Sequence, residues 1–293
     1  MSIHKDNAGG EVPNNFGGLP EEYSNYEDSK VVVVPVPYAG TVSYGTGTEK
    51  GPGAIIKASQ HMELYDEVLK KTTCERGIHT AKALKAEKTP EKMVEAVYEK
   101  TQGLLKDEKF PVFLGGEHSF SQGAVKALKE KYSDLSVLQL DAHADLREEY
   151  EGEKFSHAAV LRRIRELGCK TASVGIRSLS ADEAELIEKE KIPVFWAHEM
   201  CGKDVSEEVL KELSENVYIT LDLDVFDPAV MPSTGTPEPG GLGWYDVISI
   251  LEKVFAGKNV VGFDVVELAP IKELSAPDFI AAKIVYRMIG YKK

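Results

Sequence analysis

Hydrophobic positions follow two patterns that alternate along the chain from residue 31 onwards. Short apolar runs, mostly of β-branched or aromatic residues, are typical of strands that are buried on both faces. Between them lie longer segments with apolar positions at helical spacing and charged outer faces. The pattern predicts strands at residues 31–36, 111–114, 135–140, 171–175, 192–195, 217–221 and 260–266, and helices at residues 52–70, 91–106, 120–132, 158–167, 182–190, 206–213, 244–255 and 277–289.

This alternation of strands and helices predicts an α/β fold. Near-continuous apolar strands joined by helices form a parallel sheet, and the right-handed crossovers place helices on both of its faces. We therefore expect a three-layer α/β/α sandwich with a central, mainly parallel β-sheet. The loops that leave the carboxyl ends of its strands share one edge, where ligands usually bind in such sheets.

The chain divides into a short polar segment and one large domain. Residues 1–30 are rich in Gly, Asn and Glu. We expect them to form an N-terminal arm that folds over the domain or packs on a neighbouring subunit. Residues 31–293 are expected to form a single domain, since 293 residues lie near the upper limit for one hydrophobic core.

Charge and cysteine content limit the classes of partner. Lys and Arg total 35 against 48 Asp and Glu, and the net charge of −13 repels nucleic-acid phosphates and anionic lipid but attracts small cations. The three cysteines include no CxxC pair, so neither a disulfide framework nor a zinc ribbon is indicated. No apolar run approaches the roughly 20 residues that span a bilayer, and no signal-peptide core is visible. We expect a cytoplasmic protein that binds neither nucleic acid nor membrane.

Carboxylate and imidazole side chains gather at the ends of three predicted strands, in GGEHS at residues 115–119, DAHAD at 141–145 and TLDLD at 220–224. In an extended backbone, side chains two positions apart project to the same side. A single Asp at a strand end often only caps the next helix, but so many like charges repel one another without a cation. The candidate metal ligands are His118, Asp141, His143, Asp145, Asp222 and Asp224.

The chemistry of this ligand set favours two Mn²⁺ ions in each subunit. Four carboxylates and two imidazoles without a thiolate suit Mn²⁺ better than structural zinc. Six ligands exceed the needs of one ion unless some of them bridge, which indicates two ions about 3.5 to 4 Å apart. Four Asp balance the charge of two Mn²⁺, and the pKa of a water bound there falls towards neutrality.

The three motifs, in this order and followed by Pro228, resemble those of the ureohydrolases, the family of arginase, agmatinase and their relatives. The resemblance spans residues 31–293. It implies the arginase-like fold, a single ureohydrolase catalytic domain, a homotrimer or homohexamer, and a hydrolase of linear amidine C–N bonds that releases urea. It also implies that one Mn²⁺ is held by His118, Asp141, Asp145 and Asp222, and the other by Asp141, His143, Asp222 and Asp224, with Asp141 and Asp222 as bridges.

The same resemblance suggests two catalytic residues. Glu267, in DVVEL at residues 264–268, occupies the family position that binds the guanidinium of the substrate. His157, in SHA at residues 156–158, falls where the family places a mobile histidine that protonates the leaving amine. A solvated strand-end glutamate and a helix-start histidine without a catalytic role are the alternatives.

Substrate choice depends on the residues after the DAHAD motif. Arginases carry an Asn that helps to hold the α-carboxylate of the substrate where this chain has Arg147, although Arg147 itself could bind a carboxylate. The acidic loop at residues 148–153, with Glu149 and Glu151, is expected to line the mouth of the site, unless it is a solvated surface run. Such a mouth favours a substrate that ends in an amine.

The segments VPVPY at residues 34–38 and GTVSYG at 40–45 also look more like those of agmatinases than of arginases. We therefore expect a small cationic guanidino substrate, agmatine, cleaved to urea and putrescine in polyamine biosynthesis. The alternatives are N1-aminopropylagmatine, guanidinobutyrate, arginine or formiminoglutamate as the substrate, and a non-catalytic binding subunit.

Overall fold

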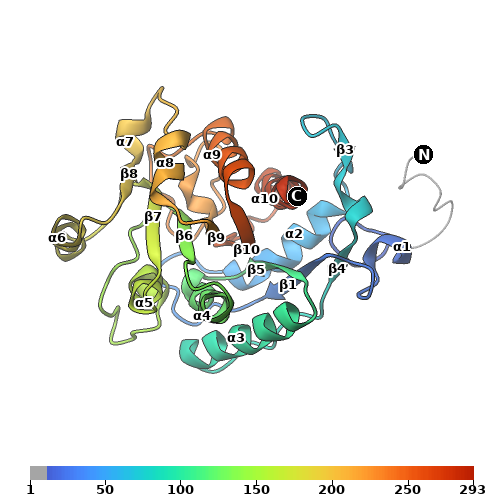
Figure 1. The fold of residues 1–293 in the computed structure, drawn as a ribbon, viewed down its shortest axis with the longest axis horizontal. Coiled ribbons are helices and arrows are strands. Elements are labelled where there is room, and N and C mark those ends of the chain that lie inside the picture. The colour runs from blue at the N-terminus through green and yellow to red at the C-terminus, as the bar shows by residue number, and fades with distance from the viewer. Residues whose placement is uncertain (1–11) are drawn as a thin grey trace.

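A parallel sheet of eight strands forms the centre of the molecule (Figure 1). The structure is a computed structural model and describes residues 12–293. Every pairing between neighbouring strands of this sheet is parallel. Each predicted strand overlaps an observed one, which confirms the predicted fold class. In order across the sheet the strands are β4 (Ile78–Thr80), β1 (Val31–Val36), β5 (Phe110–Gly115), β10 (Asn259–Val266), β9 (Asn216–Asp222), β6 (Ser136–Leu140), β7 (Lys170–Ile176) and β8 (Val194–Trp196).

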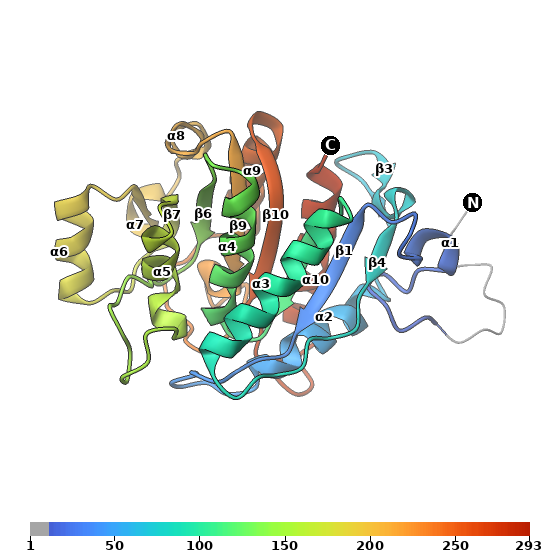
Figure 2. The ribbon, with the colours of Figure 1, turned by 60° about the horizontal axis from the view of Figure 1, so that its bottom comes forward.

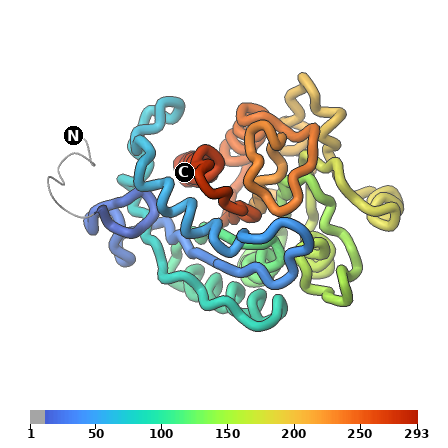
Figure 3. The backbone as a smooth tube through the Cα atoms, turned by 180° about the vertical axis from the view of Figure 1, so that it is seen from behind, coloured from blue at the N-terminus to red at the C-terminus, as the bar shows by residue number. Residues whose placement is uncertain are grey.

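Helices cover both faces of the sheet, because alternate residues of each strand point to opposite faces. In β1, Val32 and Val34 belong to one hydrophobic core and Val31 and Val33 to the other. The first core contains residues of α3 (Pro90–Lys106), α4 (Ser121–Lys131) and α5 (Val160–Glu166), which lie in front of the sheet in Figure 2. The second contains residues of α2 (Gly51–Ser59), α8 (Ser206–Glu212), α9 (Trp244–Gly257) and α10 (Ala276–Tyr291), of which α2 and α10 lie side by side in the view from behind (Figure 3).

One predicted helix, at residues 52–70, is too long. The structure ends α2 at Ser59 and continues into a small antiparallel hairpin of β2 (Tyr65–Asp66) and β3 (Lys71–Thr72). Asp66 causes the difference, because its Oδ1 accepts hydrogen bonds from the backbone N–H groups of Val68 and Leu69. This local turn competes with helical hydrogen bonding.

Short elements complete the description, and several of them were not predicted. The edge strand β4 is only three residues long, and α7 (Ala197–Met200) is a single turn. The remaining helices are α1 (Glu21–Ser24) and α6 (Ala181–Glu190), and the 3₁₀ turns are η1 (Thr48–Lys50), η2 (Thr73–Arg76), η3 (His118–Phe120), η4 (His157–Ala159) and η5 (Leu223–Val225). No helix within residues 12–293 is both long enough and apolar enough to cross a membrane.

The described part of the N-terminal arm, residues 12–30, packs on the sheet domain of its own chain. Phe16 and Leu19 are fully buried in the core that contains α2. The backbone N–H of Phe16 donates to Thr80 Oγ1 and that of Gly17 donates to Ser59 Oγ, both at 2.8 Å. Residues 1–11 of the predicted arm lie outside the described residues.

Four neighbouring strands in the middle of the sheet, β5, β10, β9 and β6, end at the same level. Leu114, Val265, Leu221 and Leu140 stand in register across them. The residues that follow these four positions therefore emerge together at one edge of the sheet. All three sequence motifs are among them.

Candidate active site

A cavity of about 230 Å³ opens at this edge of the sheet. Residues at or just beyond the carboxyl ends of all four central strands line it, so segments far apart in the sequence meet here. Every predicted metal ligand, both predicted catalytic residues and Arg147 form part of its wall: His118, Asp141, His143, Asp145, Asp222, Asp224, His157, Glu267 and Arg147.

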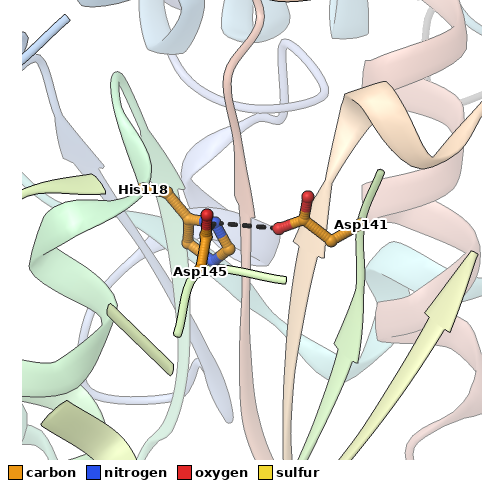
Figure 4. Close-up of side chains that lie close together, drawn as sticks. All are labelled: His118, Asp141 and Asp145. Atoms are coloured by element: carbon orange, nitrogen blue, oxygen red, sulfur yellow. Dashed lines mark ion pairs between the residues drawn. The ribbon is translucent and has the colours of Figure 1, made fainter. Parts of the chain in front are cut away.

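His118 begins η3, separated from β5 by Gly116 and Glu117, and directs one ring nitrogen at three carboxylates. Figure 4 shows His118 with two of these residues, Asp141 and Asp145. Its Nδ1 lies 3.1 Å from Asp145 Oδ2, 3.2 Å from Asp141 Oδ2 and 3.5 Å from Asp222 Oδ2. Among the described residues this buried Nδ1 has no hydrogen-bond partner. An imidazole nitrogen that is unpaired yet surrounded by carboxylates is what a metal-ligand set requires.

The other ring nitrogen of His118 makes a hydrogen bond that fixes the tautomer. Nε2 lies 2.7 Å from Thr220 Oγ1, and the Thr220 hydroxyl donates to Asp264 Oδ1 at 2.6 Å. Since the single hydroxyl proton goes to Asp264, Thr220 accepts from His118 Nε2–H. The Nδ1 of neutral His118 then carries a lone pair, as a metal ligand must.

His143 contributes a second, overlapping group of ligand atoms. Its Nδ1 lies 2.8 Å from Asp224 Oδ2 and 3.6 Å from Asp141 Oδ1. Asp141 thus presents Oδ2 to His118 and Oδ1 to His143, which is the position of a bridging carboxylate. Two sets of side chains offer ligand atoms within 4.8 Å of one another: His118, Asp141 and Asp145, and Asp141, His143 and Asp224.

The pKa values show how strongly these groups interact. Burial alone would lower the pKa of His118, but the neighbouring carboxylates of Asp141 and Asp145 raise it well above its usual value. Burial and the charge of Asp141 raise the pKa of Asp145 to about 7. Burial and the charge of Asp224 raise that of Asp222 well above its usual range. Without metal, bound protons reduce the repulsion among these carboxylates, and divalent cations would neutralise the same charges more fully. The residues therefore fit a pair of metal ions.

Glu267 follows β10 and faces the same cavity. It is one of the few non-glycine residues within 12–293 that have positive φ, at 67°, and its Oε1 accepts a hydrogen bond of 2.7 Å from the backbone N–H of His118. Burial and the charge of Glu117 raise the pKa of Glu267 to about 8. Such a carboxyl is suited to ionise when a cation binds next to it.

His157 opens η4 and is half-buried in the cavity wall. The ring of Tyr150 stands edge-on to its ring, with 5.6 Å between the centroids. Burial and the charges of His118 and His143 lower the pKa of His157 to about 4. The imidazole is therefore neutral in the metal-free site at neutral pH.

The wall beyond Asp145 includes Arg147, Tyr150 and Glu183. The Arg147 guanidinium lies over the Tyr150 ring, 5.3 Å from its centroid, and Arg147 Nε is 3.9 Å from Glu183 Oε2. Glu183 is buried and caps α6, accepting hydrogen bonds from the backbone N–H groups of Leu146 and Ser180. This wall thus carries one positive and one negative side chain around an aromatic ring.

The acidic loop differs from the expectation. It contributes Tyr150 to the wall, whereas Glu149 and Glu151 are exposed and do not line the cavity. Glu148 instead lies 3.1 Å from Arg162 and 3.6 Å from Arg163, in ion pairs on α5. The arginines of α5 draw the loop towards the helix surface, and the wall carboxylate is Glu183.

Sequence reasoning missed three residues of the site. Glu183 lies within the predicted helix at residues 182–190, and its spacing from Ser180, which is that of a capping box, is the signal that could have singled it out. Tyr150 lies within the acidic loop, where the prediction considered only the glutamates as wall residues. Thr41, which contacts His157 at 3.1 Å, lies in a loop whose approach to the site no local pattern indicates.

Comparison with known proteins agrees with this geometry. Residues 29–290 match the arginase family. An N(1)-aminopropylagmatine ureohydrolase of Synechocystis is 40% identical over 95% of this chain and 96% of its own length, and an agmatinase of Pyrococcus horikoshii is 35% identical over 90% and 92%. The crystal structure of an agmatine ureohydrolase of Thermoplasma volcanium superposes with a TM-score of 0.87 at 31% identity, covering 96% of this chain and 95% of that one. The chain therefore belongs to the arginase family, as a ureohydrolase of the agmatinase type that acts on linear amidine C–N bonds.

Proposed function

We propose that this chain is a manganese enzyme that hydrolyses the guanidino group of agmatine, or of its N1-aminopropyl derivative, to urea and an amine. The observation that carries the proposal is the convergence of two overlapping ligand sets with Glu267 and His157 on one cavity. The proposed ligands are His118, Asp141, Asp145 and Asp222 for one ion, and Asp141, His143, Asp222 and Asp224 for the other. When bound, the ions would supply activation of water for attack on the guanidinium carbon.

Glu267 is the proposed acceptor for the guanidinium N–H groups. Its Oε1 is already fixed by the backbone N–H of His118, so the carboxylate is held next to the proposed ligands. A planar guanidinium fits a carboxylate through paired hydrogen bonds. This contact orients the guanidinium carbon for attack.

His157 is the proposed proton donor to the leaving amine. As the C–N bond breaks, the amine nitrogen takes the Nε2 proton of an imidazolium and leaves a neutral ring. Solvent then returns a proton to Nε2. The low pKa of His157 in the metal-free site favours this release.

The charges of the wall around Glu183 favour a substrate whose far end is an amine. Agmatine ends in an ammonium, which the Glu183 carboxylate and the face of Tyr150 attract. Arginine adds an α-carboxylate, which Glu183 repels. Arg147 is partly compensated by Glu183 at 3.9 Å, so its attraction for that carboxylate is reduced.

The N1-aminopropyl derivative is the second candidate because of the named relatives. Those at 40% and 39% identity, from Synechocystis and Thermus thermophilus, bear the name N(1)-aminopropylagmatine ureohydrolase. The cavity wall also includes Tyr44, which is 82% exposed at the mouth. A longer polyamine tail would extend past this ring towards solvent.

Urea release from a panel of guanidino compounds tests the proposal. With Mn²⁺ added, agmatine or aminopropylagmatine should exceed arginine in kcat/KM by about 30-fold, equivalent to about 2 kcal/mol. Guanidinobutyrate and formiminoglutamate complete the panel. Arg147→Met should leave the rate on agmatine nearly unchanged. A preference for arginine that this variant abolishes would contradict the proposed tail site and assign the α-carboxylate to Arg147.

We propose a homotrimer or homohexamer, supported by large apolar side chains that one chain leaves exposed, among them Tyr65, Val68 and Phe279. Light scattering after gel filtration measures the mass directly, and a monomer would contradict the proposed assembly.

We propose a cytoplasmic location, supported by the free state of Cys74, Cys169 and Cys201.

A further inference from the structure

Thr41 links His157 to a buried glutamate that has no role in the reaction described above. Glu117 immediately precedes His118 and is fully buried. Its carboxylate accepts hydrogen bonds from Thr41 N at 2.6 Å, Thr41 Oγ1 at 2.8 Å and Ser119 Oγ at 2.5 Å. Three donors thus surround this one carboxyl group, and each of them donates to it.

The direction of these hydrogen bonds determines the tautomer of His157. The Thr41 hydroxyl has one proton, and that proton goes to Glu117 Oε1. Thr41 Oγ1 must therefore accept from His157, whose backbone N and ring Nδ1 both lie 3.1 Å away. Nδ1 carries the proton in the neutral ring, and the lone pair resides on Nε2, the nitrogen remote from Thr41.

Three segments distant in the sequence build this arrangement. Thr41 lies in the loop after β1, Glu117 follows β5, and His157 opens η4. Tyr150 contacts the imidazole edge-on from the acidic loop. The ring is thus held both through its Nδ1 and through its edge, in a wall that is otherwise made of loops.

We propose that Thr41 and Glu117 are positioning residues that hold His157 as the Nδ1–H tautomer, with Nε2 available to carry the proton for the leaving amine. The inference rests on the proposed role of His157. Glu117 acts on His157 through Thr41, because its carboxylate fixes the direction of the Thr41 hydroxyl. In an acid–base histidine the wrong tautomer lowers kcat by as much as about 10⁴-fold.

A double-mutant cycle tests the link in the Mn²⁺-loaded enzyme. Thr41→Val keeps the side-chain volume but removes the acceptor, and should lower kcat by about 10- to 100-fold while KM changes by less than about threefold. Thr41→Ser keeps the hydroxyl and should restore most of the rate. Introduced into His157→Ala, Thr41→Val should cause no further loss, since both changes remove the same function.

The matched control is Thr46→Val, which changes an exposed threonine of the same loop that does not line the cavity. It should leave kcat unchanged. Manganese content, measured on every variant, should stay at the unmodified level. Equal losses for Thr41→Val with and without His157, or equal losses for Thr41→Val and Thr41→Ser, would overturn the inference and make Thr41 a packing residue.

The tautomer can be observed without any turnover. In the full chain labelled with ¹⁵N-histidine and loaded with diamagnetic Mg²⁺, long-range ¹H–¹⁵N NMR should report Nδ1–H for His157 at neutral pH. Thr41→Val and Glu117→Gln should both shift the ring towards Nε2–H. An Nε2–H tautomer in the unmodified protein would refute the inference. If instead the spectra agree but no guanidino compound releases urea, the proposed function fails and the positioning of His157 stands.

Discussion

Two carboxylate residues of the site adopt an uncommon backbone conformation. Asp145 and Glu267 have φ values of 53° and 67°, in the left-handed region that non-glycine residues seldom occupy. Such residues cost about 1–3 kcal/mol each and persist only where the surroundings hold them. Glu267 is held by its backbone N–H, which donates to Gly116 O at 2.8 Å, and by its Oε1 contact with His118. The strain directs a carboxylate into the cavity from the end of a buried strand.

Replacement of Glu267 by glutamine should weaken catalysis without removing metal. The amide keeps the shape and can still accept from His118 N–H, but it lacks the charge that pairs with the guanidinium. A hydrogen bond to a charged group contributes about 1.5–3 kcal/mol, so kcat/KM should fall by roughly 10- to 100-fold. Steady-state kinetics with metal analysis measures this effect. A rate near that of the unmodified enzyme would make Glu267 a structural residue.

Replacement of His157 by alanine should lower kcat by roughly 10- to 10⁴-fold and leave the metal content unchanged. The side chain contacts Thr41 and Tyr150 and is not one of the proposed ligands, so the metal site should remain intact. Urea release at neutral pH and metal analysis of the same sample check both parts. An unchanged rate would assign the histidine to the packing of η4.

Elements differ in how well the sequence predicts them, for physical reasons. The central strands are apolar on both faces, and each of them begins and ends within one or two residues of its predicted bounds. The three motifs could be placed together because parallel strands share a carboxyl edge. The helix at residues 52–70 was overextended because the turn depends on Asp66, whose partner Arg287 lies in α10. The far wall was misassigned because ion pairs with α5, invisible in a local pattern, decide where the acidic loop lies.

The Asp66–Arg287 pair should anchor the β2–β3 hairpin to α10. Both side chains are buried, so Asp66→Ala leaves the Arg287 guanidinium without its buried partner and should reduce the free energy of unfolding by about 3–5 kcal/mol. Glu67→Ala is the matched control, because the Glu67 side chain is 67% exposed and its contact with Arg287 should contribute less than about 1 kcal/mol. Urea denaturation of both variants compares them. Equal losses would mean that the buried pair does not anchor the hairpin.

At the scale of the whole molecule, the metal-free cluster should make stability depend on pH. Asp145 and Glu267 have raised pKa values in the folded state, about 7 and about 8, whereas both ionise near pH 4 when unfolded. Their contribution is fully present below pH 4 and is lost as pH rises through the folded values. The pKa of His157 is lowered on folding, to about 4, so its contribution makes stability rise with pH, but only up to about pH 6.5.

The Tm of the metal-free protein should therefore fall between pH 6.5 and 8. Mn²⁺ replaces protons as the counter-charge, so it should raise the Tm most at pH 8. At a concentration 100 times the dissociation constant, one bound ion adds about 2.7 kcal/mol to the free energy of unfolding. Differential scanning calorimetry with a chelator or with Mn²⁺ measures both effects. A metal-free Tm that rises over this range would contradict the proposed charge balance.

The position of β10 in the sheet has a consequence for biosynthesis. This strand is the last to be made, at residues 259–266, yet it stands between β5 and β9 in the middle of the sheet. Until it leaves the ribosome, β4, β1 and β5 have no strand connection to β9, β6, β7 and β8. The nascent chain then consists of two half-sheets, each with an open inner edge that is prone to pair wrongly. Closure of the sheet, and the meeting of His118 with Asp222, must await the synthesis of residues 259–266. Nonsense or frameshift products that end before residue 259 should therefore aggregate instead of retaining partial function.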